Sequence, residues 1–127
     1  MPSPGARPAR IATLEEFWPF YVGQHRRRGT RIFHFVGTTV GLLFLVRAVA
    51  TERPLLLLCG VVSAYGLAWM GHFLIEKNNP ATFQYPLWSL RSDLKMYRLM
   101  WRGKMTAEAE RLGLAAPAGT VLDRPVS

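Results

Sequence analysis

Two long apolar runs joined by a short link restrict the possible folds of this chain more than any other feature. Residues 32–50 and 55–75 carry almost no charge, and only residues 51–54 separate them. As a helix, the 19-residue first run would be roughly 28 Å long, which matches the hydrocarbon core of a bilayer at about 30 Å. Two such runs are hard to bury in a globule of 127 residues. The sequence therefore predicts an all-α fold organised around a transmembrane helical hairpin, with a soluble helical hairpin as the alternative.

Interfacial amphipathic helices are expected on both sides of this hairpin, the first with its Trp and Tyr side chains at the depth of the lipid headgroups. Thr13 and Glu16 form a capping box, which predicts a helix from Thr13 to about His25, followed by a basic connector over residues 24–31. As a helix, residues 87–101 would have one apolar face and one basic face. This pattern is typical of a helix lying on an anionic membrane surface. Packing of that helix on a protein partner is the alternative.

These elements define one helical domain over residues 13–104. It contains transmembrane helices at about 32–50 and 55–75 and the amphipathic helix at about 87–101. The segments outside it, residues 1–12 and 105–127, are expected to be a disordered tail and a partly disordered tail.

The positive charge of the chain gathers at the outer ends of the apolar runs. The formal net charge is +8, and only Arg47 and Arg53 lie near the link. This distribution predicts an integral membrane protein with both termini in the cytoplasm. We see no RNA or DNA motif, so an anionic lipid bilayer is a better partner than nucleic acid. The other basic residues near the runs are Arg7, Arg10, Arg26, Arg27, Arg28 and Arg31 before the first, and Lys77, Arg91, Lys95, Arg98, Arg102 and Lys104 after the second.

All three histidines of the chain are expected to meet at one end of the hairpin. His34 lies near the start of the first run and His72 near the end of the second, so an antiparallel hairpin gives them similar depth. Glu76 follows His72 by four residues, and His25 comes from the connector at the same end. Stripes of small residues, which favour close helix packing, turn His34 and His72 toward each other if the stripes face. The stripes are Gly37 and Gly41 on the first run and Gly60, Ala64 and Ala68 on the second.

Three imidazoles and a carboxylate are the ligand types of a catalytic metal site. They suit Fe(II), Zn(II) or Mn(II), and two histidines with one carboxylate form the ligand set of non-heme iron oxygenases. Without thiolates, a closed structural zinc site is less favoured. Asp93, Asn78 and Asn79 are candidates for orienting the imidazoles. Taken singly, each histidine also fits a packing role and Glu76 fits a solvated one, but ionisable groups inside membrane segments are costly and tend to be functional.

At these residues the chain resembles the membrane-embedded 2-hydroxy-fatty-acid dioxygenase family of fatty-acid α-oxidation, which includes a fungal endoplasmic-reticulum enzyme and many short bacterial relatives. The resemblance covers about residues 17–100, and through the short bacterial relatives it implies a bacterial inner membrane. Its motifs are His25 and His34 nine residues apart, Gly71-His72, Glu76-Lys77, Pro80-Ala81 and Ser89-Leu90.

The resemblance implies an Fe(II)-dependent reaction in which O2 cleaves a 2-hydroxy fatty acid to the acid one carbon shorter. It places the family's histidines on His25, His34 and His72 and the motif carboxylate on Glu76. The fungal chain has further membrane segments, so a homodimer is a candidate assembly for enclosing the acyl chain here. The fungal chain is also basic where this one has Asn78-Asn79. The cations available here for the substrate carboxylate are Arg26, Arg27, Arg28 and Lys77.

Two other classes of function stay open. A non-catalytic membrane module that binds anionic lipid or a partner complex would be insensitive to loss of its histidines. A zinc or di-metal hydrolase acting on a lipid would need neither iron nor O2.

Overall fold

The computed structural model describes residues 10–114, and all regular elements in that range are helical. The tails expected at residues 1–12 and 105–127 fall largely outside the described range. The elements are α1 (Leu14–Gly23), α2 (Arg28–Thr51), α3 (Leu55–Met70), the π-helix η1 (Gly71–Glu76), the 3-10 helix η2 (Ala81–Phe83), α4 (Pro86–Trp101) and α5 (Met105–Arg111).

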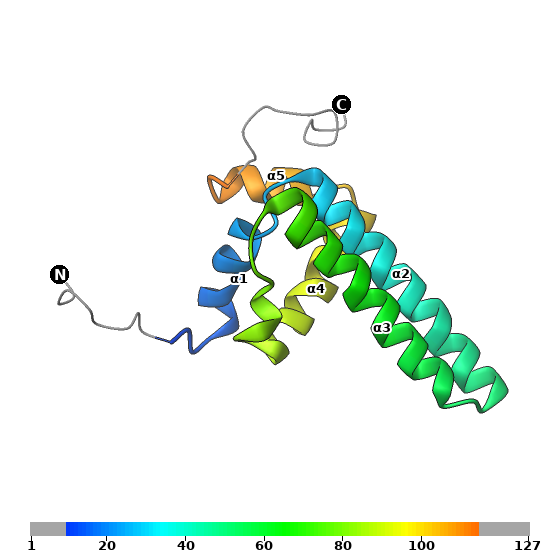
Figure 1. Ribbon diagram of the computed structural model, residues 1–127. Coiled ribbons are helices and arrows are strands. Elements are labelled where there is room, and N and C mark those ends of the chain that lie inside the picture. The colour runs from blue at the N-terminus through cyan, green and yellow to red at the C-terminus, as the bar shows by residue number, and fades with distance from the viewer. Residues whose placement is uncertain (1–9, 115–127) are drawn as a thin grey trace.

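The two apolar runs form α2 and α3, which pack against each other as a hairpin (Figure 1). Small residues let the two backbones approach closely. A Cβ atom added to Gly37 would lie 2.8 Å from the carbonyl oxygen of Ala64, and one added to Gly60 would lie 2.9 Å from Cβ of Phe44. A Cβ on Gly41 would meet Cβ of Ala64 at 3.2 Å. The facing stripes of small residues are therefore confirmed.

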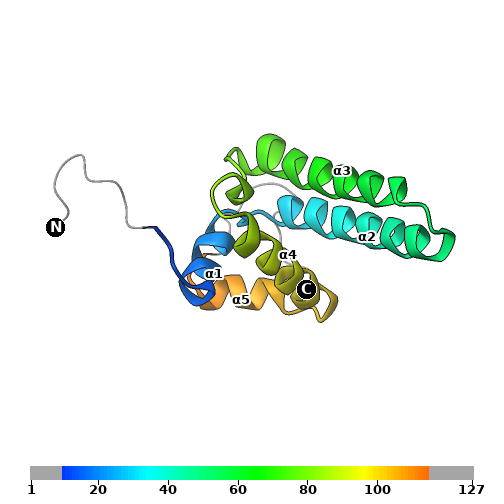
Figure 2. The same cartoon turned by 90° about the horizontal axis from the view of Figure 1, so that it is seen from below.

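The remaining helices pack at one end of this hairpin. Both views show the α2–α3 link extending away from α1, α4 and α5 (Figures 1 and 2). Thr13 caps α1, because its Oγ1 accepts a hydrogen bond from the backbone N–H of Glu16. Phe17, Trp18 and Tyr21 of α1 are not at an exposed interface: they are buried in a small core with residues of η2, α4 and α5. That core contains Phe17, Trp18, Tyr21, Val22, Ala81, Met96, Met105 and Ala109.

The long helices expose most of their apolar surface. Both the segment Arg28–Thr51 and the segment Leu55–Glu76 are long and apolar enough to cross a membrane. Only 17% and 22% of their most apolar windows are buried within the protein, whereas the core helix of a soluble protein is mostly buried. On α4, the apolar side chains of Leu87 and Trp101 are 75% and 67% exposed.

Two helix boundaries differ from the sequence predictions. α2 starts at Arg28 rather than after a connector that reaches residue 31, because Glu76 caps its N-terminus as described below. The second apolar run does not stay α-helical to its end: its last turn, Gly71–Glu76, is a π-helix. Short π-helical turns are rare in proteins, and many of those that are found lie at functional sites.

Candidate metal centre

Three buried histidines converge at the packed end of the hairpin. His25 follows α1, His34 lies in α2 and His72 lies in η1, and their exposed fractions are 1%, 6% and 2%. The Nε2 atom of His34 lies 3.1 Å from Nε2 of His25 and 3.1 Å from Nε2 of His72. The ligand atoms of all three residues lie within 4.8 Å of one another. The three histidines could therefore hold one metal ion.

The other ring nitrogen of each histidine faces an oxygen atom. Nδ1 of His25 lies 2.7 Å from the carbonyl oxygen of Tyr21, and Nδ1 of His72 lies 2.7 Å from Oδ1 of Asn78. Nδ1 of His34 lies 3.3 Å from Oδ1 of Asp93. With an acceptor at each Nδ1, the favoured tautomer of each neutral imidazole carries its hydrogen there. The three converging Nε2 atoms then present lone pairs to one another.

Three lone pairs that face one point repel one another unless a cation lies between them. Burial, reinforced by the neighbouring rings of His34 and His72, lowers the pKa of His25 well below 6.5, so a proton is a poor candidate for that cation at neutral pH. The donor set therefore fits a metal ion. Oxygen partners on the second nitrogen are also the usual feature of metal-bound histidines.

A glycine brings η1 close enough to α2 to align two of these histidines. A Cβ atom on Gly71 would lie 3.1 Å from Cβ of Phe33 and 3.2 Å from Cα and the carbonyl oxygen of Thr30. This close approach places His72, the next residue, beside His34, one turn after Thr30. The close contact with α2 thus explains why a glycine precedes His72 in the sequence.

Asp93 is held from two sides at the edge of this site. It comes from α4, and its Oδ1 accepts a hydrogen bond from the hydroxyl of Tyr21 as well as lying close to His34. Burial raises the pKa of Asp93 above 3.8, although the bond from Tyr21 acts in the opposite direction. The same burial, with the nearby Asp93 carboxylate, raises the pKa of Tyr21 well above 10.0. Asp93 therefore links α1, α2 and α4 around His34.

Glu76 is not a member of the histidine group. Its carboxylate accepts hydrogen bonds from the backbone N–H groups of Arg26 at 2.9 Å and Arg27 at 3.0 Å, and from Oγ1 of Thr30 at 2.7 Å. These donors lie at the start of α2, where the helix has no acidic residue in its first turn and no side-chain cap of its own. Glu76 thus acts as a cap supplied by another segment, with the charge that a helix N-terminus favours.

The remaining predicted site residues lie around the histidines without joining them. Asn78 donates from Nδ2 to the carbonyl oxygen of Gln24 at 3.0 Å, which orients its Oδ1 toward His72. Asn79 and Lys77 are exposed. Arg26 and Arg27 contribute backbone N–H groups as described, and Arg28 begins α2.

Two residues at this site were missed by the sequence analysis. The ring of Tyr21 stacks on His25 with centroids 4.0 Å apart, and Thr30 connects α2 to η1 through its hydrogen bond to Glu76. Tyr21 lies four residues before His25, and because the sequence predicts a helix to about His25, this spacing of one helical turn could have identified it. No local pattern marks Thr30, because its partner is 46 residues away.

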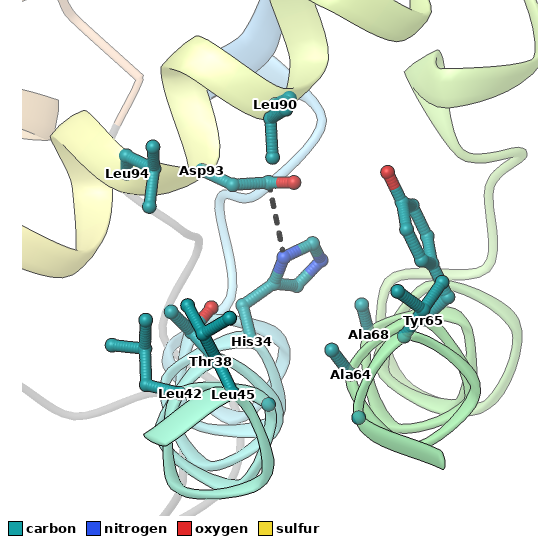
Figure 3. A pocket seen from close by; sticks show the side chains of 13 residues that line it. His34, Thr38, Leu42, Leu45, Ala64, Tyr65, Ala68, Leu90, Asp93 and Leu94 are labelled. Carbon is teal, nitrogen blue, oxygen red and sulfur yellow. Dashed lines mark ion pairs between the residues drawn. The ribbon is translucent and has the colours of Figure 1, made fainter. Parts of the chain in front are cut away.

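A cavity of about 270 Å³ opens beside His34. Figure 3 looks along the hairpin: α2 and α3 form the floor, and Asp93, Leu90 and Leu94 lie across it on α4. The hydroxyl end of Tyr65 projects upward from α3 on the opposite side of the same space. The site is therefore reached from a cavity that is mostly apolar in its lining.

One family model matches the chain over residues 11–105, and its description is "2-hydroxy-palmitic acid dioxygenase Mpo1-like". No curated protein and no solved structure matches the chain.

Proposed function

The chain belongs to the Mpo1-like 2-hydroxy-palmitic acid dioxygenase family, and on that premise we propose that it is an Fe(II)-dependent dioxygenase. In this proposal, O2 converts a 2-hydroxy fatty acid to the acid one carbon shorter. The observation that carries the proposal is the convergence of three buried Nε2 atoms, each on a ring whose Nδ1 faces an oxygen atom.

We propose His25, His34 and His72 as the protein ligands, with Glu76 positioning the site through the N-terminus of α2. The three converging Nε2 atoms would hold the ion. Imidazole ligands without thiolates suit Fe(II), which would supply further positions for the substrate and O2.

Fe(II) bound there would supply the redox chemistry with O2 that amino-acid side chains lack. The reaction balances without an outside reductant if the lost carbon leaves as CO2: the 2-hydroxy acid and O2 give the shorter acid, CO2 and water. This agrees with a sequence in which we see no motif for a nucleotide or a second cofactor. The residues of the chain orient the rings through Asp93, Asn78 and the Tyr21 carbonyl, and burial limits the access of water.

We further propose that α2 and the segment Leu55–Glu76 span a membrane, with both termini in the cytoplasm. The apolar side chains that they expose support this, since a surface of this kind is unfavourable in water. The basic residues at the packed end of the hairpin, opposite the α2–α3 link, suit the anionic surface of the cytoplasmic leaflet. A fatty acid dissolved in the bilayer would then reach the metal centre at its own depth.

The proposal is tested by O2 consumption with purified protein reconstituted with Fe(II) without air. We expect 2-hydroxypalmitic acid to trigger O2 uptake and to yield the acid one carbon shorter. Palmitic acid, which lacks the 2-hydroxyl group, is the matched control and should give neither. A protein that binds iron but gives no shortened acid would overturn the proposed reaction. Activity with zinc and without O2 would favour a lipid hydrolase.

A further inference from the structure

The cavity beside His34 continues along the hairpin as a groove on one face of each long helix. On α2, Thr38, Leu42 and Leu45 follow His34 at four, eight and eleven residues, which places all of them on one side of the helix. On α3, residues 61, 64, 65 and 68 lead along the facing side toward His72. Both stripes therefore run from the metal centre toward the α2–α3 link.

The groove changes from polar to apolar along its length. At the end next to the histidines it is lined by His34, Thr38 and Asp93, and farther away by Leu42, Leu45 and Val61. In Figure 3, Leu90 and Leu94 of α4 cover this space from above, and the leucine side chains of α2 line its lower left. A ligand that fits this lining has a polar head beside His34 and a long apolar tail.

From this arrangement we propose that the groove is the acyl-chain subsite of the enzyme, with the chain lying along α2 from His34 to Leu45. The proposal rests on the dioxygenase function proposed above. The eleven residue steps from His34 to Leu45 span about 16 Å, which is roughly the length of twelve carbon–carbon bonds of an extended chain at about 1.3 Å for each bond. Longer chains would continue beyond Leu45 into the surrounding lipid.

A groove of this kind selects by shape rather than by the hydrophobic effect. An acyl chain that comes from lipid gains little from moving into another apolar environment, since lipid tails are as apolar as leucine side chains. A bulky side chain in the groove should therefore exclude long substrates sterically and spare short ones. Leu42 is the best position for such a change, because it lies about 12 Å from His34 along the helix and leaves space for a short chain.

The test compares Leu42→Trp with Leu43→Trp. Leu43 is the next residue on α2, is 65% exposed and does not line the groove, whereas Leu42 lines it and is 40% exposed. We expect Leu42→Trp to lower kcat/KM for 2-hydroxypalmitic acid by about tenfold or more while kcat/KM for 2-hydroxyhexanoic acid and the iron content stay near wild type. Leu43→Trp should leave all three unchanged. Equal effects of the two variants, or equal loss of both substrates in Leu42→Trp, would overturn the proposal.

A binding experiment separates this proposal from the proposed reaction. The probe is 2-hydroxypalmitic acid with a diazirine at carbon 12, about the length of chain that reaches Leu45, added to Fe(II)-loaded protein without O2 and activated by light. Labelling of Leu45 or Val61 that excess 2-hydroxypalmitic acid suppresses would support the groove even if no turnover were found. Labelling confined to outward side chains such as Leu43 and Val62, without competition, would overturn it even if turnover were found.

Discussion

Replacing Glu76 by Gln distinguishes a helix cap from a metal ligand. The carboxylate of Glu76 accepts three hydrogen bonds, from Arg26, Arg27 and Thr30. Glutamine keeps one oxygen acceptor but presents an NH2 group where the other oxygen was, so at least one donor at the start of α2 is left facing another donor. The three histidine nitrogens are not altered by this change.

The expected loss of stability follows from these contacts. Loss of one hydrogen bond to a charged acceptor costs about 1.5–3 kcal/mol, and loss of the negative charge at a helix N-terminus costs about 0.3–1 kcal/mol more. The free energy of unfolding should therefore fall by about 2–4 kcal/mol, which for a chain of 127 residues corresponds to a decrease in Tm of about 7–15 °C. Iron content after reconstitution with excess Fe(II) should remain near that of the wild type.

The assay is thermal unfolding in detergent followed by circular dichroism, with iron measured on the same samples. Glu52→Gln is the matched control, because Glu52 is an exposed carboxylate near the hairpin link, and its change should affect neither quantity. If Glu76→Gln loses its iron while its Tm is unchanged, Glu76 is a ligand and the capping role is wrong.

Three further changes test other parts of the structure. Gly37→Ala should destabilise the hairpin by about 1–3 kcal/mol, because its Cβ would lie 2.8 Å from a backbone oxygen. Gly66→Ala should not destabilise the hairpin, since nothing lies within 4 Å of a Cβ atom at that position. Chemical unfolding of the two variants measures the difference in their free energies of unfolding. Lys77→Gly should raise the free energy of unfolding by about 1 kcal/mol, since Lys77 has a φ of 64°, a left-handed conformation that glycine adopts without strain. The same change should leave KM for the fatty acid unchanged, because Lys77 does not line the cavity. An increase in KM would instead indicate that Lys77 contacts the substrate carboxylate. Hydrogen bonds from Arg111 and Trp18 lower the pKa of Glu108 from 4.5 to about 2, so its stabilising effect is complete above pH 4.5 and is lost as the pH falls toward 2; Glu108→Gln should therefore show a smaller loss of stability than wild type across that range in an acid titration.

Much of the fold could be predicted because its signals are local. The apolar runs predicted two long helices, and the second of these starts at Leu55 as expected. The capping box at Thr13 and the apolar and basic pattern of residues 87–101 identified α1 and α4 close to their observed bounds. The small-residue stripes predicted the facing surfaces of the hairpin, and with them the meeting of His34 and His72.

The features that could not be predicted depend on contacts between distant segments. A spacing of four residues indicated that His72 and Glu76 share a face, yet the turn is π-helical, and Glu76 binds donors about 50 residues away at the start of α2. The same contact explains why α2 begins at Arg28. The burial of the α1 aromatic residues was also unexpected, since Trp and Tyr in a membrane protein suit the lipid interface equally well by composition.

The binding of one metal ion by three imidazoles is tested most directly by metal content. Protein purified without air and loaded with Fe(II) should retain about one iron per chain, the number expected for a single site with three nitrogen ligands. His34→Ala removes the ring that lies 3.1 Å from both of the others and should lose nearly all of this iron while circular dichroism shows the same helix content. A wild-type protein that retains no metal, or a His34→Ala variant that retains as much iron as wild type, would contradict the proposed site.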